Sequence, residues 1–171
     1  MTFSGAVLGS PIAHSLSPKI HLSAYEYLKV DGSFSRVEVK TGELESFLES
    51  SHGFNAFALT APLKEELFSL ASLKNWNIDQ SASLVRSANT LLIKEKSSIY
   101  STDYLAIHRL LLGNEIGNEI LILGSGGTVR ALLGAFAQIQ GEISAREPTS
   151  KIKITLVNRS ISRASKLKEE F

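Results

Sequence analysis

The sequence predicts an α/β protein, and three features carry that prediction. Short apolar runs typical of strands alternate along the chain with amphipathic stretches typical of helices. One continuous apolar run, residues 120–123, leads directly into a glycine-rich segment and then a helical pattern. The chain has 171 residues, of which 43% are hydrophobic and 20% are charged, so it has ordinary globular composition and is long enough to bury a core.

The charge balance and the cysteine count exclude several classes of function. The formal net charge is +1, so the composition predicts no general affinity for nucleic acid or for a membrane surface. The absence of cysteine excludes a disulfide framework, a thiolate zinc site and a cysteine nucleophile. The sequence shows neither a basic segment ahead of an apolar stretch at its start nor a run of about 18 apolar residues. We therefore expect a cytoplasmic, metal-independent protein that is neither secreted nor membrane-spanning.

Residues 1–103 form the first predicted unit. The apolar residues 6–8 end at Gly9 and indicate a strand. Ser17 followed by Pro18 is typical of a helix start, with Ser17 as the N-cap. The same signals predict strands over 34–39, 57–59, 89–93 and 98–100 and helices over 42–49 and 62–70, with a less regular stretch between 71 and 88.

Residues 104–171 form the second predicted unit, and we place the boundary at its connecting helix. Residues 105–112 indicate that helix, which ends at Gly113. A buried strand over 120–123, a glycine turn and a helix then form half of a βαβ unit. The remaining predicted elements are a loop over 141–150, a second strand over 152–157 and a last helix that Ser160 opens.

The glycine turn has the composition of a dinucleotide-binding turn. Gly124, Gly126 and Gly127 would let backbone N–H groups approach a pyrophosphate at the positive end of the following helix. Val129 stands where the common fingerprint has its third glycine. A strand-to-helix turn without any ligand is the structural alternative.

The end of the second strand of this unit bears on the choice of cofactor. An NAD-binding unit places a carboxylate there, and this sequence has Asn158, Arg159 and Ser160 instead. Arg159 and Arg163 could together hold a 2′-phosphate, because a guanidinium group makes paired contacts to phosphate oxygens. NADP is therefore favoured over NAD. The alternative is that Ser160 only caps the helix and the arginines are solvated.

The first unit contains side chains suited to acid–base chemistry. Lys64 falls in the first turn of a helix, where the helix dipole disfavours an ammonium group, as a general acid or base near neutral pH requires. Asp103 could pair with Lys64 and set its protonation, and Asn89 offers an amide. The structural alternatives are a solvated lysine and a helix cap at Asp103 or Thr102.

Two hydroxyl groups lie two residues apart in a loop ahead of the first helix, on Ser15 and Ser17. Such a loop could hydrogen-bond a small polyol or a carboxylate. The alternatives are an N-cap role for Ser17 and a packed loop position for the neighbouring His14.

Taken together and in this order, these segments resemble the shikimate dehydrogenase family. The matching segments cover essentially the whole chain: residues 9–18, 59–64, 88–90, 102–103, 124–130 and 158–160, with Arg163. The resemblance implies an N-terminal α/β substrate-binding domain over 1–103, followed by the first part of a Rossmann-like NADP-binding domain over 104–171. The implied activity is the reversible NADPH-dependent reduction of 3-dehydroshikimate to shikimate, in the pathway to chorismate and the aromatic amino acids.

The resemblance also implies a role for each matching residue. Ser15 and Ser17 match the hydroxyls that bind the substrate carboxylate, and Thr60 and Asn89 match residues that contact the ring hydroxyls. Lys64 and Asp103 match the catalytic pair, which also contacts the substrate. The implied cofactor residues are Gly124, Ser125, Gly126, Gly127 and Thr128 for the pyrophosphate and Asn158, Arg159, Ser160 and Arg163 for the 2′-phosphate.

The sequence also departs from the family pattern. The family commonly has Asn-Val-Thr before the lysine segment and Thr-Asp-Gly at the aspartate, whereas this chain has Ala-Leu-Thr at 58–60 and Thr-Asp-Tyr at 102–104. Because Tyr104 replaces that glycine, it affects the local backbone and so the direction of the Asp103 side chain. Only two of the roughly six strands of a dinucleotide domain are present. We therefore expect the 171-residue chain to be weakly active or inactive, with exposed sheet edges and apolar faces beyond about residue 115.

Three other interpretations stay open at this point. A quinate or quinate/shikimate dehydrogenase would need only a modest change of pocket. A non-catalytic paralogue could bind a shikimate-like ligand without reducing it. Nucleic-acid binding is the weakest of the three, because the basic residues of segment 151–171 carry no interleaved aromatic side chains. The expected partner is a small molecule, and the expected state is a monomer or a homodimer.

Overall fold

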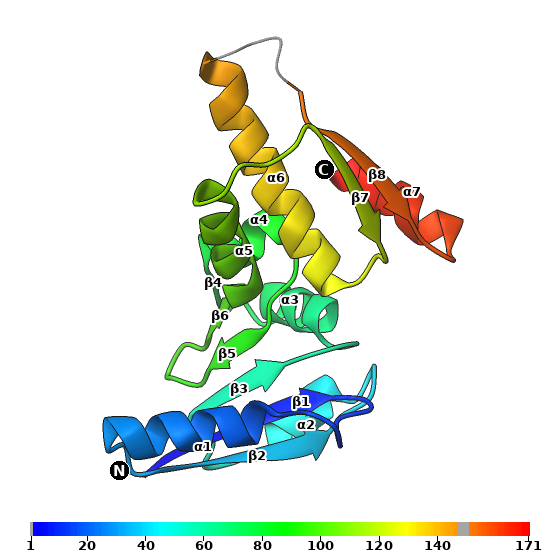
Figure 1. The fold of residues 1–171 in the computed structure, drawn as a ribbon. Helices are drawn as coiled ribbons and strands as arrows, with labels where there is room; N and C mark the ends of the chain where they lie inside the picture. Colours follow the sequence, from blue (N-terminus) through cyan, green and yellow to red (C-terminus); the bar gives the residue numbers. More distant parts are fainter. Residues whose placement is uncertain (1, 147–150) are drawn as a thin grey trace.

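The computed structural model describes residues 2–146 and 151–171 and has the predicted α/β architecture, with strands and helices alternating along the chain (Figure 1). Its strands form two sheets. One has six strands in the order β2-β1-β3-β5-β6-β4, and the other consists of β7 and β8.

The larger sheet is parallel at one end and mixed at the other. In its parallel part, β1 lies between β2 and β3. Next to β3 is an antiparallel pair, β5 and β6, and β4 adds parallel to β6 at the edge. The strand bounds are β1 (Phe3–Gly9), β2 (Gly32–Glu38), β3 (Ala56–Leu59), β4 (Asn77–Ile78), β5 (Thr90–Leu92) and β6 (Ser98–Tyr100).

Helices cover both faces of this sheet. Successive side chains of a strand point to opposite faces, so the strands place apolar side chains on each face for the helices to cover. Val7 and Phe34 face the side on which α1 (Ser17–Leu28) lies. Ala6 and Leu8 face the side of α2 (Leu44–Ser50) and α3 (Lys64–Leu73). This second side holds the main core, where Leu44, Phe57, Leu63, Leu67 and Leu91 are almost completely buried. The core therefore fixes both ends of β3 and the start of α3.

The second unit packs on the first through helices. The order along the chain is α4 (Gln80–Val85), α5 (Thr102–Leu112), β7 (Glu119–Leu123), α6 (Gly127–Arg146), β8 (Lys153–Val157) and α7 (Ile161–Glu170). Helix α5 contacts both α4 and α6 (Figure 1). A cluster that includes Ile122 of β7, Leu133 of α6 and Leu167 of α7 binds the two helices to one face of the small sheet.

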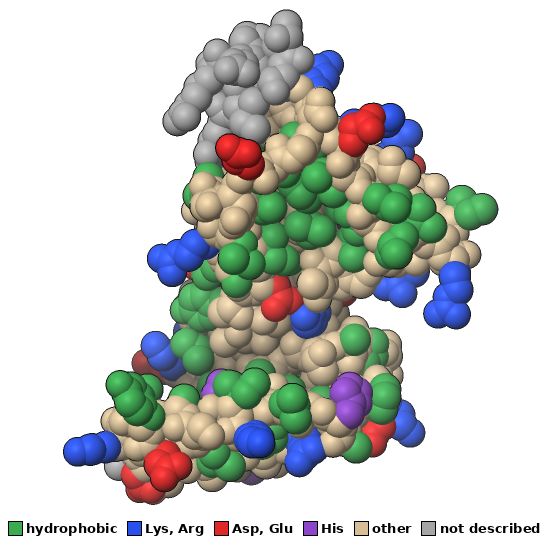
Figure 2. All heavy atoms as spheres, viewed as in Figure 1, with side chains coloured by type: hydrophobic (Ala, Val, Ile, Leu, Met, Phe, Trp, Pro, Cys, Tyr) green, Lys and Arg blue, Asp and Glu red, His purple; other side chains and the backbone are tan. Residues whose placement is uncertain are grey.

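The other face of the small sheet is apolar and exposed, as the sequence predicts. The side chains of Leu121, Leu123 and Val157 are 64%, 73% and 51% exposed. Hydrophobic side chains gather over the half of the molecule that contains α6 and β7 (Figure 2).

Several predicted details of the elements are wrong. Ser17 is not an N-cap but the first residue of α1, and its backbone N–H donates to Ser15 Oγ at 3.3 Å. Neither Asp103 nor Thr102 caps α5, because Ser101 Oγ accepts from the backbone N–H of Tyr104.

Two further predictions about secondary structure also fail. The loop expected from residue 141 begins later, since α6 continues to Arg146, and the rest of that prediction lies outside the described residues. The less regular stretch contains β4 and α4, which the sequence pattern did not predict.

Two kinds of feature are absent from the described residues. In residues 2–146 and 151–171 there is no helix long and apolar enough to cross a membrane. The same residues contain no cluster of three or more metal-ligating side chains.

His21 on α1 gives the first testable prediction. Its ring stacks on Phe34 with centroids 3.9 Å apart, and burial lowers the pKa of the imidazole from 6.5. Because the unfolded chain then binds the proton more readily, the contribution of His21 to stability is complete above its unfolded pKa and decreases as pH falls through that value. We expect the free energy of unfolding in urea to drop from pH 7 to pH 5, and to drop less in His21→Gln.

The control for this prediction is His52→Gln, since His52 is exposed in a turn. This variant should keep the pH dependence of the wild type. An identical dependence in His21→Gln and the wild type would contradict the assignment to His21.

Candidate active site

Lys64 and Asp103 form an ion pair between the start of α3 and the start of α5. The distance from Lys64 Nζ to Asp103 Oδ2 is 2.6 Å, and the two side chains are 13% and 25% exposed. Lys64 lies in the first turn of α3, as predicted, although this helix begins at Lys64 and not at residue 62, and Asp103 lies in the first turn of α5. The predicted pairing of these residues is therefore present, and both groups still reach solvent.

Asn89 holds the carboxylate of Asp103 from the other side. Its Nδ2 donates to Asp103 Oδ1 at 3.0 Å and to Thr102 Oγ1 at 2.7 Å, while its Oδ1 accepts from the backbone N–H of Thr102 at 2.8 Å. All three bonds fix the first turn of α5 relative to β5. The carboxylate of Asp103 thus has one oxygen directed at Lys64 and the other at Asn89, even though Tyr104 follows where the family has glycine.

The backbone around this cluster is tied into the large sheet. The N–H of Leu59 donates to the carbonyl of Asn89 at 2.8 Å, and the N–H of Ala88 donates to the carbonyl of Lys64 at 3.0 Å. The N–H of Asn89 donates to the carbonyl of Tyr100 at 3.0 Å. Because these bonds join the ends of β3, β5 and β6, the polar side chains stand on a rigid frame.

Residues 10–17, which join β1 to α1 and include Ser15 and Ser17, are called the serine loop and lie beside this frame. The loop follows β1, and its residue Ser10 donates a backbone hydrogen bond to the carbonyl of Ala61 at 3.2 Å. Ser15 Oγ and Ser17 Oγ are 3.2 Å apart. Arg36 of β2 donates to the carbonyl of Ala13 and so anchors the loop to the sheet.

Thr60 lies at the same edge of the large sheet, next to Gly9. A methyl group at Gly9 would lie 2.4 Å from Thr60 Cγ2, so only glycine allows β1 to end this close to β3. The ends of two neighbouring parallel strands therefore bring the serine loop and Thr60 to one edge of the sheet.

The glycine turn contacts Lys64 from the second unit. Gly124 has φ +118°, which favours glycine, and α6 begins at Gly127. A methyl group at Gly127 would lie 2.9 Å from Lys64 Cδ, and Lys64 Nζ is 3.4 Å from Thr128 Oγ1. The first N–H groups of a helix lack partners within the helix and carry its positive end, so the turn is suited to hold a phosphate.

Arg130, one turn into α6, also links the two units. It is 4% exposed, its Nε donates to the carbonyl of Val85 at 3.1 Å, and its guanidinium pairs with the carboxylate of Glu170. The guanidinium also lies over the ring of Phe171, 5.7 Å from its centroid. This residue therefore joins α4, α6 and α7.

The residues predicted to hold a 2′-phosphate lie at the end of β8 and the start of α7. Ser160 caps α7 by accepting from the backbone N–H of Arg163, and Asn158 donates to the carbonyl of Ser160 at 2.9 Å. Arg159 is exposed, and Arg163 pairs with Glu65 of α3 at 3.5 Å. An exposed pair of this kind contributes at most about 1 kcal/mol, so it leaves Arg163 free to exchange Glu65 for a phosphate.

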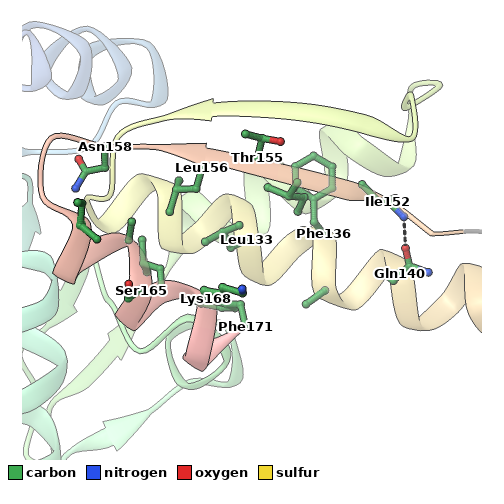
Figure 3. A pocket seen from close by; sticks show the side chains of 15 residues that line it. Leu133, Phe136, Gln140, Ile152, Thr155, Leu156, Asn158, Ser165, Lys168 and Phe171 are labelled. Atoms are coloured by element: carbon green, nitrogen blue, oxygen red, sulfur yellow. Dashed lines mark hydrogen bonds between the residues drawn. The ribbon is translucent and has the colours of Figure 1, made fainter.

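A cavity of about 720 Å³ lies nearby, between α6, β8 and α7. Figure 3 shows Asn158 at one end of it and Gln140, which accepts from the N–H of Ile152, at the other. Most of its lining is apolar, including Leu133, Leu156 and Phe171. None of the predicted substrate residues lines this cavity, and of the predicted cofactor residues it includes Asn158 alone.

Sequence reasoning missed two of the residues that build the site. Thr102 was considered only as a helix cap, whereas its Oγ1 and N–H both bind Asn89. Arg130 had no predicted role of its own, although its position in a helix between apolar neighbours was a signal that its stem is buried.

Comparison with known proteins agrees with the resemblance. Residues 7–91 match the family model described as the shikimate dehydrogenase substrate binding domain. Over 97% of its length the chain is 33% identical to the shikimate dehydrogenase (NADP(+)) of Methanococcoides burtonii, and over 96% it is 34% identical to that of Bartonella quintana.

Solved structures of the same group have the same fold. Shikimate dehydrogenase from Aquifex aeolicus gives a TM-score of 0.79 at 26% identity, with 99% of this chain and 60% of that chain covered. Shikimate 5-dehydrogenase from Thermus thermophilus, solved in complex with NADP(H) and shikimate, gives 0.72 at 32% identity, with the same coverage.

The chain spans 58% of the length of the Methanococcoides relative and 54% of the Bartonella relative. The similarity nevertheless extends through both units, from the serine loop to α7. The family model, the relatives and the solved structures thus agree in one respect: the chain is similar to shikimate dehydrogenases, and its residues 7–91 match their substrate binding domain.

Proposed function

We propose that this chain supplies the substrate site and the phosphate-binding turn of an NADP-dependent shikimate dehydrogenase, which reversibly reduces 3-dehydroshikimate to shikimate. The observation that carries the proposal is the 2.6 Å ion pair of Lys64 and Asp103, set between the edge of the sheet and the glycine turn. The names of the relatives support the substrate and the cofactor.

The proposed substrate residues divide by chemistry. Ser15 and Ser17 would donate to the carboxylate of the substrate, since hydroxyls are donors to such a group. Thr60 and Asn89 would contact the ring hydroxyls. Lys64 and Asp103 would lie at the reacting carbon, with Asp103 accepting from a substrate hydroxyl while it orients the ammonium group.

The proton step follows from this arrangement. NADPH, when bound, supplies the hydride. Lys64 would give a proton from Nζ to the oxygen of the reduced carbonyl, so that an N–H bond breaks as an O–H bond forms. Both carboxylate oxygens of Asp103 have partners, Oδ2 in Lys64 and Oδ1 in Asn89. The carboxylate is therefore fixed in place and would keep Nζ directed at the oxygen of the substrate. In the reverse direction Lys64 would accept the same proton.

For the cofactor, we propose that Gly124 to Thr128 hold the pyrophosphate at the start of α6. Asn158, Arg159, Ser160 and Arg163 would hold the 2′-phosphate at the start of α7. The fit is supported by the positive φ of Gly124, by the helix start at Gly127 and by the exposed guanidinium of Arg159. We place the domain boundary between residues 103 and 104, at the start of the helix that links the two sites.

We further propose that the protein acts in the cytoplasm as a monomer or a homodimer.

Isothermal titration calorimetry on the 171-residue chain tests the proposed function. We expect it to bind shikimate, to bind quinate more weakly, and to bind 2′,5′-ADP more tightly than 5′-AMP, because only the former carries the 2′-phosphate. Arg159→Ala should remove the preference for 2′,5′-ADP and leave shikimate binding unchanged. If millimolar shikimate produces no heat of binding, the proposed substrate is wrong.

A further inference from the structure

We propose that Thr128 is a positioning residue for Lys64, by which the glycine turn of the second unit orients the ammonium group of the first. The inference rests on the proposed function and deepens it, since it assigns to Thr128 a side-chain role in addition to any contact of its backbone with phosphate. The juxtaposition that carries it joins three residues, Asp103, Lys64 and Thr128.

The hydrogen bonds of Lys64 leave one direction open. An ammonium group has three donors. One is directed at Asp103 Oδ2, 2.6 Å away, and a second at Thr128 Oγ1, 3.4 Å away. With two donors fixed by residues of different units, the third has a defined direction, which is available to the oxygen of a substrate.

The packing around Thr128 shows that its approach to Lys64 is built into the fold. At Gly127, the preceding residue, a methyl group would lie 2.9 Å from Lys64 Cδ and 3.0 Å from Ser87 Oγ. Ser87 is buried, and Arg130 anchors the next part of α6 to the carbonyl of Val85 at 3.1 Å. The start of α6 is therefore seated on the stem of Lys64 and fixed on both sides of Thr128.

A hydroxyl suits this position because it can serve both protonation states of Lys64. While Nζ is an ammonium, Thr128 Oγ1 accepts a hydrogen bond from it. After the proton has passed to the substrate oxygen, Nζ carries a lone pair and one N–H fewer, and the Thr128 O–H can turn to donate to it. Asp103 as a carboxylate can only accept, so it still holds one of the two remaining N–H groups, and Thr128 is the partner of the two that can also donate to the lone pair.

The test uses two substitutions and a matched control. Thr128→Val keeps the shape of the side chain and removes the hydroxyl, whereas Thr128→Ser restores it. Thr155→Val makes the same change on β8, at an exposed threonine outside the proposed site. The first readout is the ¹H–¹⁵N resonance of the Lys64 ammonium group in the ligand-free 171-residue chain, assigned by its loss in Lys64→Arg. The second is the affinity for shikimate.

We expect Thr128→Val to shift or abolish the Lys64 resonance and to weaken shikimate binding about fivefold, the size of effect typical of a single hydrogen bond. Thr128→Ser should restore both, and Thr155→Val should change neither. An unchanged resonance in Thr128→Val, or a failure of Thr128→Ser to restore it, overturns the proposal. If the wild type does not bind shikimate, the proposed function fails, and the resonance alone still decides the role of Thr128.

Discussion

Replacing Asp103 with alanine is expected to weaken shikimate binding by the 171-residue chain about 100-fold. Asp103 is proposed to accept from a substrate hydroxyl and to orient Lys64, so its removal takes away one hydrogen bond to a charged group and weakens a second, at a combined cost of about 2–3 kcal/mol in binding. Here Lys64 Nζ would lose the oxygen at 2.6 Å, and Asn89 Nδ2 would lose the one at 3.0 Å. Titration calorimetry of the variant and the wild type measures the change.

Two further variants show whether the loss arises from the pair. Lys64→Met combined with Asp103→Ala should bind more weakly than Asp103→Ala, because it also removes the donor to the substrate oxygen, but the loss should be smaller than the sum of the two single losses, as expected for coupled residues. Asp31→Ala removes an exposed carboxylate whose partner is Thr2, and it should leave shikimate affinity unchanged. An affinity of Asp103→Ala close to that of the wild type would refute a role of the pair in binding.

Replacing Arg130 with methionine is expected to cost about 3–5 kcal/mol of stability, the usual effect of breaking a buried ion pair by removing one partner. The guanidinium is 4% exposed and pairs with Glu170, while its Nε holds the carbonyl of Val85. Arg86 and Lys166, the other cations near Glu170, are both 4.0 Å from its carboxylate and largely exposed, so they replace Arg130 poorly.

The position of Arg130 between the units provides a second readout. The sole tryptophan of the chain, Trp76, packs against the main core and therefore reports on the first unit. In urea, we expect the circular dichroism of Arg130→Met to change at a lower concentration than the fluorescence of Trp76. Adding Glu170→Gln should recover part of the loss, because it removes the unpaired carboxylate. A loss of less than about 1 kcal/mol in Arg130→Met would contradict the assigned role.

The part of the site that could be predicted from the sequence is the part defined by local signals. The helix start after Pro62 placed Lys64 in a first turn, and the strand–glycine–helix pattern around Gly124 predicted the second unit correctly. The pairing of Lys64 with Asp103 was also predicted, although the chain separates them by 39 positions. It required only that two strand ends meet at one edge of a sheet.

Other features depend on tertiary contacts, which a local pattern does not reveal. Ser17 failed as an N-cap because the helix starts one position earlier than expected, with Leu16 as the N-cap residue and Ser17 as the first residue of α1. The two residues of β4 are too few to show a period, and only pairing with β6 makes them a strand. Gly141 did not end α6, since a glycine within a helix costs only about 1 kcal/mol relative to alanine.

The antiparallel pair of β5 and β6 has a consequence for the order in which the chain folds. These strands are joined by the short segment 93–97, so closing this hairpin costs little loop entropy, whereas β1 reaches β3 only across the whole of α1, β2 and α2. Contacts between near neighbours in sequence form faster than distant ones. Asn89 directly precedes this hairpin and Asp103 closely follows it. The acceptor side of the proposed catalytic pair is thus expected to assemble early in folding, before α3 docks and brings Lys64 to it.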